Sequence, residues 1–219
     1  MTDQQVTRYA RLINVAALLA LLGVLAGSLY LQFDIGEQPC PLCLVQRSGM
    51  IGLAVGPVMN LLWGMRPAHY ALSILAASVG MAGSVRQILL HINDPIGEGY
   101  GPAVLGWHLY TWAAVTFAIA IVGCALLLLW TRPFIVVDQG VLTDVRWMRL
   151  VSLFAITWLF LDLLAIGVSV LPECGLGMCP DDPENLSGGW PVVFILGLVS
   201  AVVAYLLDRR LEARRAPAA

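Results

Sequence analysis

Long apolar stretches separated by short polar connections run the length of this 219-residue chain. Each stretch approaches the roughly 20 mostly apolar residues that a helix needs to cross a bilayer. The six stretches cover about residues 13–33, 44–63, 70–90, 112–130, 151–171 and 190–207. The pattern predicts six membrane-spanning helices that pair into three hairpins within one compact bundle, with both chain termini on the same side of the membrane.

Composition supports the same class, because 59% of the residues are hydrophobic, 12% are charged and the mean hydropathy is +0.83. Such values are typical of membrane proteins. The first stretch is longer than the roughly 7–15 apolar residues of a signal peptide, and no A-x-A site closes it. We therefore expect it to be retained as a span.

All twelve basic residues are arginines, and their distribution along the chain is uneven. Arg47 and Arg86 lie near one face of the predicted bundle. The other ten fall in the tails and the even-numbered connections: Arg8, Arg11, Arg66, Arg132, Arg146, Arg149, Arg209, Arg210, Arg214 and Arg215. Because cytoplasmic loops carry an excess of basic residues, both termini are expected in the cytoplasm and the odd-numbered connections on the outer side.

Two of the connections have distinctive compositions. Residues 91–111 are rich in glycine and aromatic residues, which suits a segment lying along the headgroup interface. Residues 131–149 contain two short apolar runs around Gly140, a pattern that predicts a small β-hairpin.

Four of the five cysteines form two close pairs on the predicted outer side, where disulfides are permitted. Cys40 and Cys43 begin the second span, and Arg47 follows one helical turn later. A helix N-terminus and a nearby arginine both favour the thiolate of Cys43, and a stabilised thiolate leaves readily when its disulfide is attacked. The pair is therefore predicted to be a catalytic disulfide that exchanges electrons.

Two other interpretations of the Cys40/Cys43 pair are open. The disulfide could simply staple the loop, although closing so short a loop stabilises a fold little. The pair could also contribute to a metal site with the second cysteine pair, as four thiolates, because neither cysteine loop contains a histidine.

The remaining chemistry-bearing residues are less constrained. Cys174 and Cys179 lie in a segment rich in glycine and proline, which suits either a mobile shuttle or an ordinary loop disulfide. Cys124 lies within the fourth span, where a thiol packs as a small apolar residue. Asp162 is near the centre of the fifth span, at a cost of about 2.5–3.5 kcal/mol. It is either a proton relay or a protonated side chain that bonds to a neighbouring helix.

The segment Gln38-Pro-Cys-Pro-Leu-Cys-Leu-Val-Gln46-Arg47 resembles the DsbB family of inner-membrane thiol oxidases, and Arg86-Gln-Ile-Leu-Leu-His91 resembles it more weakly. The resemblance covers about residues 10–130. It implies an all-α integral membrane protein with a DsbB-like four-helix transmembrane core at residues 1–130. A cytoplasmic connection at 131–150 and an additional transmembrane hairpin at 151–219 would follow, giving six spans.

The resemblance also implies an activity and its participants. Members of the family pass electrons from a periplasmic DsbA-like thioredoxin-fold oxidase to ubiquinone or menaquinone, in the lipid bilayer of the bacterial inner membrane. No nucleic acid is expected as a partner. By position, Cys43 resembles the family cysteine next to the quinone, Cys40 its partner, and Arg47 the arginine beside the quinone ring.

Three further residues near the outer face have two possible roles. His91 and Arg86 are expected to bind the quinone, with anchoring at the membrane interface as the alternative, and His108 could do either. Arg47 itself could instead satisfy lipid headgroups, as arginines near helix ends often do.

The chain departs from the family in the position of its second cysteine pair. That pair normally lies between the third and fourth spans, whereas Cys174 and Cys179 follow the fifth span here. Either these two cysteines relay electrons from the partner to Cys40/Cys43, or the partner reacts with Cys40/Cys43 directly. A non-catalytic scaffold or small transporter with structural disulfides, and a metal-handling protein with a four-thiolate site, are the competing hypotheses from other functional classes.

Overall fold

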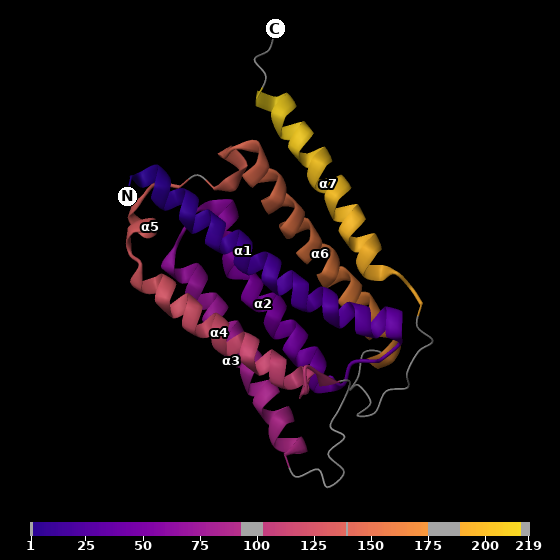
Figure 1. Cartoon of the computed structure of the whole chain (residues 1–219). Helices are drawn as coiled ribbons and strands as arrows, with labels where there is room; N and C mark the ends of the chain where they lie inside the picture. The colour runs from indigo at the N-terminus through magenta and orange to yellow at the C-terminus, as the bar shows by residue number, and fades with distance from the viewer. Residues whose placement is uncertain (1, 93–102, 139, 175–188, 216–219) are drawn as a thin grey trace.

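The computed structural model describes residues 2–92, 103–138, 140–174 and 189–215, with the backbone alone at 171–174. Within these residues, six helices are long and apolar enough to span a membrane, so the protein is an all-α membrane protein with six spans, as predicted. They are α1 (Asp3–Tyr30), α2 (Pro41–Trp63), α3 (Pro67–His91), α4 (Leu109–Leu129), α6 (Arg146–Cys174) and α7 (Val192–Arg215). They lie side by side, and α7 packs along α6 at the margin of the bundle (Figure 1).

The helices begin and end where local chemistry allows. Thr2 and Gln5 form a reciprocal capping box, which starts α1 about ten residues before its apolar stretch. One π-helical turn, η1 (Leu31–Ile35), extends α1, and Gly36 then adopts a φ of 88° that ends the helix. Proline occupies the first position of both α2 and α3, where its missing N–H is not needed.

The helices α2, α3 and α4 form the tightest part of the bundle. A Cβ atom on Gly49 would lie 2.7 Å from the Cα atom of Gly80, and a Cβ atom on Gly80 would overlap the Phe117 ring. Small residues thus let the backbones of α2 and α3 approach closely, and the buried Phe117 ring of α4 fills the space over them. This contact fixes α3 against the start of α2, where the cysteine pair lies.

The helices α1 and α6 join the other elements to this unit. Helix α1 packs on both α2 and α6, so the last two spans belong to the same bundle as the first four. Leucines of α1 and Leu159 and Ile166 of α6 contribute to one continuous apolar core.

The connection between α4 and α6 differs from the predicted β-hairpin. Its described residues form a short helix, α5 (Arg132–Ile135), and a single 3₁₀ turn, η2 (Val141–Thr143). The reason is a set of tertiary contacts, because Arg11 of α1 pairs with Asp138 and Asp144 and also donates to the Gly140 carbonyl at 2.8 Å. These contacts anchor the connection to the N-terminal part of α1, and its described residues form no ladder of strands.

A small hairpin does form in the connection between α3 and α4. Strand β1 (Ala103–Val104) pairs antiparallel with β2 (Trp107–His108) through a tight turn at Leu105 and Gly106, both with positive φ. The indole of Trp112 donates to the Val104 carbonyl at 2.9 Å, which ties the hairpin to the first turn of α4.

Candidate functional site

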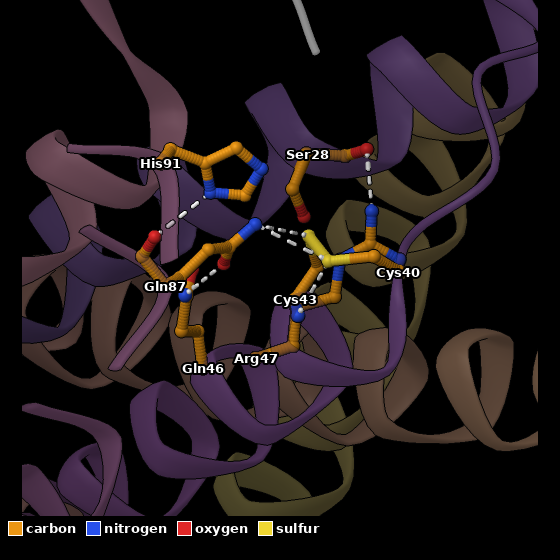
Figure 2. Close-up of a disulfide and its surroundings, with 7 residues drawn as sticks. All are labelled: Ser28, Cys40, Cys43, Gln46, Arg47, Gln87 and His91. Atoms are coloured by element: carbon orange, nitrogen blue, oxygen red, sulfur yellow. Dashed lines mark hydrogen bonds between the residues drawn. A yellow bond between two sulfur atoms is a disulfide. The ribbon is translucent and has the colours of Figure 1, made fainter. Parts of the chain in front are cut away.

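The Cys40–Cys43 pair forms a disulfide at the junction of the α1–α2 loop and α2 (Figure 2). Cys40 is the N-cap of the helix, Pro41 is its first residue, and the backbone N–H of Cys43 donates to the Cys40 sulfur at 3.2 Å. We expected the helix N-terminus to favour the Cys43 thiolate. In the structure, the backbone N–H of Cys43 instead points at the Cys40 sulfur. Because Cys40 is the cap, its side chain folds back over the first turn.

The two sulfurs differ in their surroundings. Cys40 is buried, with 6% of its surface exposed, whereas Cys43 is half-buried and lines a cavity of about 380 Å³. The walls of the cavity come from the C-terminal half of α1, the loop that follows it, the first part of α2 and the start of α4, together with Gln87 of α3 and Val104 of β1. Its volume lies within the range of about 300–1,000 Å³ that small-molecule sites commonly have.

Arg47 lies one helical turn after Cys43 and lines the same cavity. Its side chain is buried, and its guanidinium donates to Oε1 of Gln32 at 2.6 Å and to the Ser28 carbonyl at 3.0 Å. These bonds hold the guanidinium inside the protein beside Cys43. The geometry differs from that of an arginine reaching outward to lipid headgroups.

Buried glutamines surround the disulfide, and sequence reasoning did not assign them a role. Gln87 directs its amide nitrogen at both sulfurs, 3.4 Å from Cys40 Sγ and 3.8 Å from Cys43 Sγ. Its amide oxygen accepts a hydrogen bond from Gln46 at 2.7 Å, and Gln32 donates to Gln38 at 3.3 Å (Figure 2 shows the first of these pairs). The available signal was the occurrence of amide side chains within apolar spans, where polar groups mark functional positions.

His91 lies behind the cavity wall. One ring nitrogen of His91 is 2.8 Å from the Gln87 carbonyl oxygen. Its ring stacks on Tyr110 with centroids 5.3 Å apart, and His108 stacks on the same Tyr110 at 5.3 Å. Tyr110 is the member of this stack that lines the cavity. The two histidines therefore support a wall residue.

Arg86 is not brought to this cavity. Its side chain is exposed and lies in a shallow groove on the outer surface of α3, together with Val85, Leu89 and Leu90. Consecutive residues on a helix point about 100° apart. The neighbouring Gln87 therefore faces the disulfide while Arg86 faces away from it.

Glu37 is a wall residue that sequence reasoning did not single out. It lies in the loop before Cys40, is half-buried and lines the cavity together with Cys43 and Arg47. Desolvation raises the pKa of the Glu37 carboxyl above its ordinary value of 4.5. The site therefore contains a carboxyl group that holds its proton more tightly than an exposed glutamate.

The remaining predicted residues lie elsewhere or outside the described part. Cys174 ends α6 and its side chain is not described, and Cys179 lies outside the described residues, so the relay and loop-disulfide interpretations both stay open. Cys124 is buried within α4 as a free thiol, in keeping with a packing role. Asp162 is fully buried in α6 and accepts a hydrogen bond from the Trp158 indole at 3.1 Å.

Metal binding finds no support in the described part of the chain, where no group of three histidine, cysteine or acidic side chains is placed to hold an ion. The four-thiolate hypothesis depends on Cys179, which falls outside that part, and so remains a hypothesis.

Comparison with known proteins identifies the family that this region resembles. The family model "Disulfide bond formation protein DsbB" matches residues 10–96, which begin within α1 and continue a few residues past the end of α3. Curated relatives named "Disulfide bond formation protein B" include those of Xanthomonas axonopodis pv. citri (strain 306), Cupriavidus necator and Burkholderia pseudomallei (strain K96243).

The three relatives are 39%, 34% and 35% identical to this chain over 80, 81 and 97 residues. The alignments cover 34%, 36% and 42% of this chain, and 46%, 50% and 56% of the relatives. The chain thus spans about half the length of the curated relatives that it matches. No solved structure matches it. The segment that matches the DsbB family model contains Cys40, Cys43, Arg47 and Gln87.

Proposed function

We propose that this protein, whose residues 10–96 match the DsbB family, is a membrane thiol:quinone oxidoreductase. It would reoxidise a periplasmic DsbA-like thioredoxin-fold oxidase and pass the electrons to ubiquinone or menaquinone. The observation that carries the proposal is the cavity that Cys43 and Arg47 line together, directly beside the Cys40–Cys43 disulfide.

The chemistry of the cavity wall fits a quinone head group. A quinone ring needs flat apolar walls and hydrogen-bond donors near its carbonyl oxygens. Apolar side chains such as Met50 and Ala113 supply the walls, and the guanidinium of Arg47 and the phenol of Tyr110 supply donors. A bound quinone would supply the oxidant, because it takes up two electrons and two protons on reduction.

The protein residues have distinct tasks in this scheme. An incoming thiolate attacks one sulfur of the Cys40–Cys43 disulfide, the S–S bond breaks, and its electron pair stays on the other sulfur as a thiolate. Arg47 provides a fixed positive charge at the cavity wall it shares with Cys43, where negative charge develops. Glu37 can hold a proton at the same cavity wall.

Energetics favour a strong electron acceptor. DsbA-type oxidases have reduction potentials near about −120 mV, and each 30 mV of mismatch in a two-electron step costs about 1.4 kcal/mol. A disulfide that oxidises such a partner must therefore deliver its electrons to a strong oxidant. A quinone dissolved in the bilayer would be such an acceptor.

Arginine placement supports the proposed location, a bacterial inner membrane with the cysteine loops on the periplasmic side. Ten arginines lie in the tails and even-numbered connections, against two, Arg47 and Arg86, near the other face. This distribution supports a disulfide on the periplasmic side, where disulfides persist.

The decisive experiment gives purified protein a reduced thioredoxin-fold oxidase and either ubiquinone or menaquinone. We expect quinone-dependent oxidation of the partner, which Cys43→Ser abolishes. A scaffold or transporter would oxidise neither the partner nor dithiothreitol when the quinone is present. That result, obtained with folded protein, would overturn the proposal.

The same assay distinguishes the two possible roles of the second cysteine pair. If Cys174 and Cys179 relay electrons, replacing both with serine should abolish oxidation of the protein partner. Oxidation of the small reductant dithiothreitol should then continue, because that molecule can reach Cys40–Cys43 directly. Unchanged oxidation of the protein partner would instead favour direct reaction with Cys40–Cys43.

A further inference from the structure

Gln87 is the side chain of α3 that contacts the disulfide. Its side chain is 2% exposed, and its amide nitrogen lies 3.4 Å from Cys40 Sγ and 3.8 Å from Cys43 Sγ (Figure 2). The packing of α3 on α2 through small residues sets this position. The contact is therefore part of the rigid framework of the bundle.

Gln46 determines the orientation of the Gln87 amide. The amide nitrogen of Gln46 donates to the amide oxygen of Gln87 at 2.7 Å. Because the amide oxygen of Gln87 accepts this bond from Gln46, the amide nitrogen of Gln87 faces the two sulfurs. An acceptor facing the sulfurs would repel the negative charge of a thiolate and oppose reduction, whereas a donor stabilises the thiolate and favours reduction.

Two N–H donors converge on Cys40. One is Gln87, and the other is the backbone N–H of Cys43 at 3.2 Å. Cys40 is also the buried member of the pair, whereas Cys43 lines the cavity. The site thus separates the two sulfurs into one that faces the cavity and one that is held by hydrogen-bond donors.

We propose that Gln87 is a catalytic residue of the redox pair, whose N–H group stabilises the Cys40 sulfur as a thiolate once the disulfide is reduced. A hydrogen bond to a charged sulfur is stronger than one to a neutral disulfide sulfur, so the contact favours the reduced pair. Gln46 is a positioning residue that keeps the donor pointed at the sulfur.

The stabilised thiolate has a defined task when the disulfide forms again. A lone pair of the Cys40 thiolate makes the new S–S bond to Cys43 Sγ. The S–H bond of Cys43 breaks as this bond forms, and its proton and the two electrons given up by the pair go to the oxidant, which would be a quinone if the proposed function is correct. This last assignment is the single point at which the inference rests on that function.

The test measures the Cys40 thiol alone, without quinone or partner. In a chain whose other four cysteines are serine, the alkylation rate of Cys40 by iodoacetamide is followed against pH. We expect Gln87→Met, which keeps the side-chain length but lacks the donor, to move the midpoint upward by about one pH unit, a tenfold loss of thiolate below the midpoint. Gln46→Met should move the midpoint in the same direction by a smaller amount.

Controls distinguish the donor from general disturbance of α3. Ser84→Ala removes a buried hydroxyl of the same helix that donates to the Gly80 carbonyl at 3.0 Å, and it should leave the midpoint unchanged. Gln87→Glu replaces the donor by an acceptor and should raise the midpoint at least as far as Gln87→Met does. It serves as the second variant if Gln87→Met does not fold.

Midpoints within about 0.3 pH unit of the parent chain in both Gln87 variants would overturn the inference. The outcome is independent of the proposed function. Absence of quinone-linked turnover in the parent protein would refute that function without changing the alkylation profile of Cys40. An alkylation midpoint that the Gln87 variants do not shift would refute the role of Gln87 without bearing on turnover.

Discussion

Arg47 offers the sharpest test of the proposed cavity chemistry. Replacing it with methionine introduces an apolar side chain of similar length and removes the charge beside Cys43. Removing one donor from a site where negative charge develops costs about 2.7–4 kcal/mol, or about 10²–10³ in kcat. We therefore expect Arg47→Met to lower quinone-linked turnover by at least about 100-fold.

The same substitution also has a structural cost that must be measured separately. Arg47 donates to Oε1 of Gln32 and to the Ser28 carbonyl, and hydrogen bonds to charged groups contribute about 1.5–3 kcal/mol each. A lower thermal midpoint is thus expected in Arg47→Met. Arg47→Lys, which keeps the charge but not the planar fork, should recover part of the turnover.

The assay follows the loss of quinone absorbance with a short-chain ubiquinone analogue and dithiothreitol, at temperatures where every variant is folded. Arg8→Met is the matched control, because Arg8 is exposed at the opposite end of α1 and should leave turnover unchanged. Arg86→Met decides whether that exposed arginine contributes. Turnover of folded Arg47→Met within about threefold of the parent would refute the role assigned to the guanidinium.

Three further predictions concern stability and proton handling. Because burial raises the pKa of Glu37 above 4.5, the folded protein binds that proton more tightly than the unfolded chain, and its stability should fall as pH rises above this value. Glu37→Gln should flatten the dependence in thermal unfolding at different pH values, and an unchanged slope would contradict it. Gly80→Ala should destabilise the fold by about 1–3 kcal/mol, since its Cβ would overlap Phe117. Gly123→Ala is the control and should not destabilise the fold, because Gly123 has open space around it. Equal denaturation midpoints for the two variants would argue against tight packing at Gly80. Asp162→Asn should keep turnover, because an amide can still accept a hydrogen bond, and a folded but inactive variant would indicate proton transfer instead.

The sequence predicted the spans because apolar runs of membrane length have few other uses. It could not predict where each helix ends. The capping box at Thr2 extends α1 through polar residues, which a hydropathy pattern treats as a tail. The 131–149 connection shows the opposite failure, since local propensity favoured strands while the ion pairs of Arg11 imposed another path.

The candidate site likewise contains residues that the sequence predicts and one that it does not. Cys40, Cys43 and Arg47 follow one another on the first two turns of α2, so their proximity is readable from spacing alone. Gln87 lies 47 residues from Cys40 and reaches it only because α3 packs on α2. On α3, the charge of Arg86 made it the predicted site residue, yet the adjacent neutral residue Gln87 faces the sulfurs.

The Arg11 ion pairs also bear on how the protein is made. Arg11 and Asp138 are 127 residues apart, and synthesis at roughly 5–20 residues per second would separate them by about 6–25 s. The first four spans therefore emerge from the ribosome while the buried guanidinium of α1 still lacks its carboxylates. A polypeptide truncated after α4 would keep that defect permanently. The ion pairs of Arg11 can form only after residues 138–144 have been synthesised, so we expect correct assembly of the disulfide-bearing helices to need chain beyond α4.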